Sequence, residues 1–168
     1  MTAFLNGVVQ FFIPSHLLAV VALGLLTGQS AQRLPFSSLA AFAIGLLMGS
    51  LAVASAIREN PTSLALLLLA ATAAGLVVLA HDAPRWLTGV MAFAGGSALP
   101  LNAPPHELTI ANAVASQAGL AVAGIAFFMA AALVAISEKA HWQRIGIRIV
   151  ASWVAASAIL VLALRLAR

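Results

Sequence analysis

The chain has 168 residues, 63% hydrophobic and only 7% charged, with a formal net charge of +4. A soluble domain is roughly 25% charged, and so small a chain cannot hide this much apolar area from water, which excludes a water-soluble globular domain. The charges are too sparse for a nucleic-acid surface, and the lack of cysteine excludes thiolate metal sites and iron–sulfur clusters held by this chain.

The first half of the chain predicts three membrane helices. A spanning helix needs about 20 mostly apolar residues, and polar or proline-containing breaks separate such stretches at 29–35, 58–61 and 81–85. Asn60-Pro61 is a turn signal, and proline suits the first turn of the helix that follows.

The second half predicts three more helices. The fourth is short and contains Gly89, Gly95 and Gly96, so its second half is expected to be irregular or packed closely on a neighbour, and the helix either spans or is re-entrant. Pro104-Pro105 precludes a continuous helix, and 137–144 is the most charged loop. The whole predicts an all-α integral membrane protein, a single transmembrane domain over 1–168, with about six helices at 5–28, 36–57, 62–80, 86–99, 108–136 and 145–166.

The distribution of lysine and arginine predicts the orientation of this bundle. Loops that carry more Lys and Arg stay in the cytoplasm. The first, third and fifth loops carry Arg33, Arg85, Lys139, Arg144 and Arg148, whereas the other side carries Arg58, Arg165 and Arg168. We therefore expect a protein of the bacterial inner membrane with both termini on the outer side.

Glycines in the second and fifth helices predict close helix contacts. Gly45 and Gly49 form a small-xxx-small pair, and Gly119 and Gly124 offer close approach on the fifth helix. These contacts fall either within one chain or, for Gly45 and Gly49, between copies of the chain or with other membrane subunits.

His16 is the one titratable residue well inside a predicted span, and ionisable groups in a membrane suggest function. Its imidazole could bind a metal or carry protons, or could form a hydrogen bond to a neighbouring helix. If the N-terminus and the fourth loop share a side, His16 approaches His106 and Glu107. Alternatively, Glu107 caps the fifth helix, where the helix dipole favours an acid.

The other histidine and serine motifs do not predict an enzyme. His106-Glu107 is not a zinc protease motif, because the position for its second histidine holds Ile110. Ser97 suggests an intramembrane serine protease, but the candidate base His141 is expected on the opposite side, about 30 Å away. His81 fits a turn and His141 a solvated loop, so we expect no catalytic residue and no resident cofactor.

The run from Ser15 to Gln29 resembles the first helix of the HupE/UreJ family, where a His-Pro-x-x-Gly-x-Asp-His motif precedes Leu-Leu-Ala-Met and a Gly-Leu-Leu segment. Leu34-Pro35-Phe36 and Arg144-Ile145-Gly146 are similar to the starts of that family's second and last helices. The last histidine of the motif falls on His16. Its other positions hold Val9, Gln10, Ile13 and Ser15, and the family's second histidine-rich motif falls on 94–98, which has no histidine.

The resemblance implies a nickel or cobalt permease, or an accessory protein for metallocentre assembly. It implies that His16 contacts the ion, and His106 and Glu107 are the further ligands that the sequence offers. The alternative is a non-transporting subunit of a larger membrane complex, which the scarcity of polar groups inside the helices favours.

Overall fold

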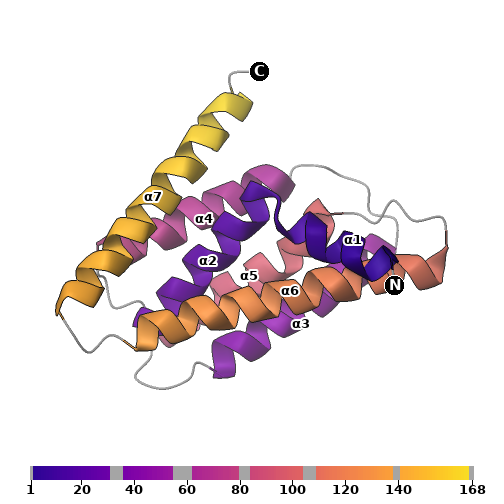
Figure 1. Ribbon diagram of the computed structural model, residues 1–168, viewed down its shortest axis with the longest axis horizontal. Coiled ribbons are helices and arrows are strands. Elements are labelled where there is room, and N and C mark those ends of the chain that lie inside the picture. Colours follow the sequence, from indigo (N-terminus) through magenta and orange to yellow (C-terminus); the bar gives the residue numbers. More distant parts are fainter. Residues whose placement is uncertain are drawn as a thin grey trace.

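The computed structural model describes residues 2–30, 36–54, 62–79, 84–103, 109–137 and 141–166. Within these ranges the chain is all-helical, with seven helices and no strand (Figure 1). The helices are α1 (Thr2–Phe11), α2 (Pro14–Gln29), α3 (Phe36–Ala54), α4 (Thr62–Val78), α5 (Arg85–Asn102), α6 (Ile110–Ile136) and α7 (His141–Leu166).

The first predicted helix, 5–28, is wrong as a single element. It is two helices, α1 and α2, which meet at an angle of 68°. The break falls at Phe12-Ile13, directly before Pro14, because proline lacks the N–H that would continue the helical hydrogen bonds and its ring clashes with the preceding turn. We call the segment from Gln10 to His16 the elbow.

The remaining helices follow the prediction closely, with one further correction. The fourth helix was expected to end near 99, but α5 continues to Asn102 and holds Pro100 inside it. Of the two alternatives for its second half, the structure shows close packing, because Gly95 lies against Leu23 and Gly96 against Phe42. Helix α7 begins four residues before the predicted start, while the last residues expected in the second helix, 55–57, lie outside the described part.

Hydroxyl side chains inside the helices satisfy themselves locally. Thr27 donates to the carbonyls of Leu23 and Gly24 at 2.9 Å, and Ser50 donates to the carbonyl of Leu46 at 2.8 Å. Such bonds to the preceding turn let a polar residue sit in an apolar helix without a partner elsewhere. The hydroxyls are therefore compatible with a surrounding of low polarity.

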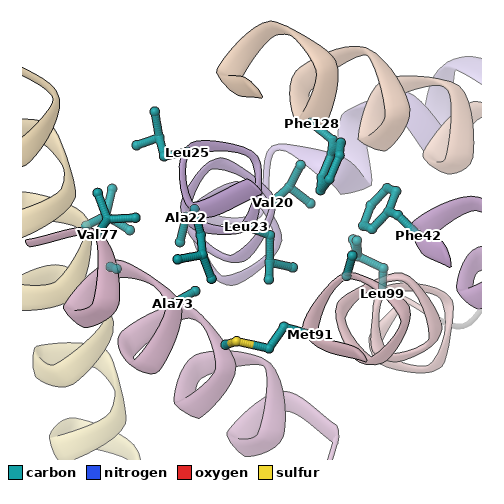
Figure 2. Close-up of a cluster of buried hydrophobic side chains, with 14 of the residues drawn as sticks. Val20, Ala22, Leu23, Leu25, Phe42, Ala73, Val77, Met91, Leu99 and Phe128 are labelled. Carbon is teal, nitrogen blue, oxygen red and sulfur yellow. The ribbon is translucent and has the colours of Figure 1, made fainter. Parts of the chain in front are cut away.

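Helix α2 runs through the centre of the molecule, between α4 and α7 on one side and α5 and α6 on the other (Figures 1 and 2). Figure 2 shows its side chains pointing in different directions, with Val20 beside Phe128 of α6, Leu23 on the side of α5 and Ala22 on the side of α4. On one side the rings of Phe42 (α3) and Phe128 (α6) are stacked with centroids 4.8 Å apart. The residues of α2 from Ala22 to Gly28 are all buried.

Glycines set the close contacts between helices. A side chain at Gly24 would meet the backbone of Phe128, and one at Gly28 would meet the backbone of Ala132. The contact moves four residues forward along α2, from Gly24 to Gly28, and also four residues forward along α6, from Phe128 to Ala132. The two helices therefore run in the same direction.

The same argument applies to α3 and α5. Gly45 lies against the carbonyl of Phe93 and Gly49 against that of Ser97, so these helices are also parallel. Both glycines are buried inside one chain. Association of two copies through Gly45 and Gly49 would therefore require α5 to be displaced.

Three described helices are long and apolar enough to cross a membrane, namely α3, α6 and α7, and the bent pair α1–α2 is a fourth candidate. Helix α6, with 27 residues, is about 40 Å long, against a hydrocarbon core of about 30 Å. Large apolar side chains such as Leu47, Leu51 and Trp153 are exposed on the outside of the bundle. The described fold is thus a helical bundle with an apolar surface.

Candidate functional site

The elbow leaves a backbone carbonyl without its helical partner. In an uninterrupted helix the carbonyl of Gln10 would accept a hydrogen bond from the N–H of residue 14, which in this chain is proline. The N–H of Ile13 reaches this oxygen at 3.2 Å, and the imidazole Nδ1 of His16 lies 3.0 Å from it. Pro14 therefore creates both the bend and the acceptor that fixes His16.

His16 is completely buried at the first turn of α2. A carbonyl oxygen can only accept, so Nδ1 carries the proton and donates it to Gln10. The other ring nitrogen, Nε2, then holds a lone pair, and it lies 3.0 Å from the amide nitrogen Nδ2 of Asn102, which donates to it. The imidazole is thus a single tautomer with one nitrogen available as a ligand atom.

Asn102 is placed by the end of α5. The helix stops there, and the N–H of Ala103 closes the last turn by donating to the carbonyl of Pro100 at 3.2 Å. Since Gly95 of α5 lies against Leu23 of α2 while Asn102 contacts His16, α5 runs antiparallel to α2. The C-terminal end of one helix thus meets the N-terminal end of the other, an arrangement that the two helix dipoles favour.

Gln117 approaches the same end of α5 from α6. Its amide nitrogen Nε2 donates to the carbonyl of Ala103 at 3.1 Å. Because only the nitrogen of an amide can donate, this bond assigns the positions of Nε2 and Oε1 in the side chain. Oε1 is buried and has no hydrogen-bond partner among the described residues. An unpaired buried oxygen costs about 1–3 kcal/mol, so it calls for an explanation.

His16 is hydrogen-bonded to Asn102, and Gln117 is hydrogen-bonded to Ala103, the next residue along the chain; we call His16, Asn102 and Gln117 the elbow cluster. Within the described residues there is no Asp or Glu, and no group of three or more His, Cys, Asp or Glu side chains that could hold a metal. The elbow cluster offers one imidazole nitrogen and two amide oxygens, donors that nickel and cobalt accept.

The other two predicted ligands, His106 and Glu107, lie outside the described residues. His16 contacts Asn102, the last residue of α5, and the described part of the fourth loop ends at the next residue, Ala103. The placement of His106 and Glu107 relative to His16 stays a prediction.

The remaining candidates form no catalytic arrangement within the described part. The hydroxyl of Ser97 donates to the carbonyl of Ala94 in its own helix at 3.0 Å. His81 and the side chain of His141 lie outside the described part. Trp86 is exposed at the start of α5.

Asn102 and Gln117 were not predicted from the sequence. An ionisable side chain inside a membrane helix suggests function, whereas the amides are neutral and give no such signal. A signal for Gln117 was present, since it is one of two amide side chains, with Asn112, in the 27 mostly apolar residues of α6. Asn102 stands directly before Ala103-Pro104-Pro105, and a polar residue at a helix end had an ordinary explanation as a turn residue.

Comparison of the chain with known protein families, with curated proteins and with solved structures finds no match.

Proposed function

We propose that this protein is an integral membrane protein of the HupE/UreJ type, which passes or holds a nickel or cobalt ion as a permease or as an accessory to metallocentre assembly. The observation that carries the proposal is the state of His16. It is a fully buried imidazole at a break in an apolar helix, with Nδ1 fixed by a backbone carbonyl and a lone pair on Nε2.

The hydrogen bond from Nδ1 to Gln10 supports a ligand role. Metal-binding histidines commonly donate their second ring N–H to a carbonyl, which fixes the tautomer and the ring orientation and makes the ligand nitrogen more basic. The elbow also resembles the broken helices at which membrane transporters bind their ions, where irregular backbone lines a site between packed helices.

The helix directions support a bundle of six spans with both ends of the chain on the outer side. Parallel α2 and α6, parallel α3 and α5, and antiparallel α2 and α5 are the directions that a chain crossing the membrane alternately would give. The excess of Lys and Arg in the first, third and fifth loops supports the placement of these loops on the cytoplasmic side.

A second candidate is a non-transporting subunit of a membrane complex. The observation that favours it is that both nitrogens of His16 already have partners within the chain. In that case His16 fastens the elbow to α5, and the exposed apolar side chains of α7, such as Trp153, would face lipid or another subunit.

Calorimetry distinguishes the two candidates. Nickel and cobalt are titrated into the detergent-solubilised full chain, as wild type and as His16→Ala. The matched control is Thr27→Val, which removes a buried hydroxyl from the same helix but only a bond to that helix's own carbonyls.

A permease or accessory protein binds the ion, loses this binding in His16→Ala and keeps it in Thr27→Val. Uptake of the ion into proteoliposomes then separates a permease from an accessory protein. If the folded wild-type chain binds neither metal, the metal function is wrong and the subunit interpretation stands.

A further inference from the structure

We propose that Asn102 and Gln117 are ligands that complete the ion site with His16, so that the described donors for the ion are all neutral. The ion would be held by the imidazole Nε2 and two amide oxygens, with water in its remaining positions. This inference rests on the proposed function, and it names two residues for which neither the sequence motifs nor the resemblance gives a role.

The contact between Asn102 and His16 must open before an ion can bind to His16. The amide nitrogen of Asn102 donates to the lone pair of Nε2 at 3.0 Å. A half-turn of the planar amide exchanges its NH₂ group for Oδ1 in nearly the same volume. Oδ1 would then face the ion beside Nε2.

The unpaired oxygen of Gln117 supplies the independent observation. Its amide nitrogen is held by the carbonyl of Ala103, so Oε1 cannot exchange places with Nε2 without losing that bond. Oε1 is buried and has no partner in the described part of the chain. Because Ala103 directly follows Asn102, the two amides belong to the same end of α5, and a bound cation would satisfy the unpaired oxygen.

A neutral set of donors has a consequence for the ion. Amide oxygens bind divalent cations more weakly than carboxylates, because they carry no net charge to offset the loss of the ion's hydration. Such a site binds loosely and releases readily, as conduction through a membrane requires. Conversion of one amide to a carboxylate should therefore tighten the site.

The test is a titration of cobalt into the detergent-solubilised full chain, monitored by calorimetry and by the visible absorption of the metal. We expect Asn102→Asp to bind cobalt at least about tenfold more tightly and to change the absorption. If Asn102 has only a structural role, Asn102→Asp should weaken cobalt binding instead, because an ionised aspartate cannot donate a hydrogen bond to Nε2 of His16. Gln117→Leu should weaken binding by about tenfold, and Gln117→Glu should tighten it.

Asn112→Leu is the matched control, since it removes an exposed amide from the same helix as Gln117. It should bind as the wild type does. If Asn102→Asp does not give a monodisperse protein, Asn102→Ser serves instead, with weakened binding expected.

The outcomes separate this inference from the proposed function. Wild type that binds no cobalt overturns both. In the other case, the wild type binds cobalt and His16→Ala does not. If the folded variants at Asn102 and Gln117 then bind cobalt as the wild type does, the ligand role of the amides alone is overturned.

Discussion

At the scale of single residues, the chemistry of the elbow follows from Pro14. The missing N–H of proline leaves the carbonyl of Gln10 without its usual helical partner, and the imidazole of His16 donates to it. This bond leaves the lone pair on the nitrogen that faces Asn102. The residue that breaks the first helix thus also determines which nitrogen of His16 can bind an ion.

His16→Ala is expected to lower the free energy of unfolding by about 2–4 kcal/mol, because it leaves a cavity and removes a partner from both Gln10 and Asn102. The measurement is denaturant unfolding in a fixed detergent. Thr27→Val is the comparison, and its loss should stay below about 1 kcal/mol. Equal losses for the two variants would mean that the bonds of His16 contribute little.

At the scale of helices, glycines decide which pairs approach closely. A Cβ atom at Gly45 would meet the backbone carbonyl of Phe93, which cannot move without its helix, whereas one at Gly89 would meet nothing within 4 Å. The two positions therefore separate packing effects from the intrinsic helix preference of glycine and alanine.

Gly45→Ala is expected to destabilise the protein by about 1–3 kcal/mol, because α3 must move away from α5. Gly89→Ala should stabilise it by about 0.5–1 kcal/mol, because alanine loses less conformational freedom in a helix than glycine does. Thermal unfolding of the purified variants checks both signs. A stabilised Gly45→Ala would contradict the close contact of α3 with α5.

The extent to which the sequence predicts this fold differs from helix to helix. The apolar stretches indicate α3, α4, α6 and α7 directly, because hydrophobic length alone identifies such helices. The bend in the first helix was missed although Pro14 was visible, since proline is also tolerated inside membrane helices. The glycines of α5 left two alternatives open, an irregular second half or close packing on a neighbour. The contacts of Gly95 with Leu23 and of Gly96 with Phe42, which decide between them, depend on the tertiary fold.

The candidate site was predictable only in part, for a related reason. His16 stood out because an imidazole in an apolar stretch is rare. Asn102 and Gln117 come from α5 and α6, far along the chain from His16. No pattern of neighbouring residues in the sequence predicts which helix an amide side chain faces. Only the packing of both helices against α2 reveals the pairing.

At the scale of the whole molecule, the directions of the helices predict where labels will react. The chain contains no cysteine, so single cysteines can be introduced without removing any. Thr2 and Ala111 are exposed at the starts of α1 and α6, and Pro84 and Ser137 are exposed at the start of α5 and the end of α6.

A maleimide that cannot cross membranes is expected to label Thr2→Cys and Ala111→Cys on intact cells. Pro84→Cys and Ser137→Cys should react only after the membrane is permeabilised, because these ends face the cytoplasm in the proposed orientation. Labelling of Thr2→Cys and Ala111→Cys from opposite sides would contradict a chain that crosses alternately.

The central position of α2 also affects how the protein is made. Synthesis releases α2 before the helices α5 and α6 that cover it, so the newly inserted His16 must wait for Asn102 before its second nitrogen has a partner. A chain that stops before Arg85 would keep a polar imidazole without its covering helices. We expect such a fragment to be recognised by membrane quality-control proteases, whereas the full chain escapes them once α5 closes over the elbow.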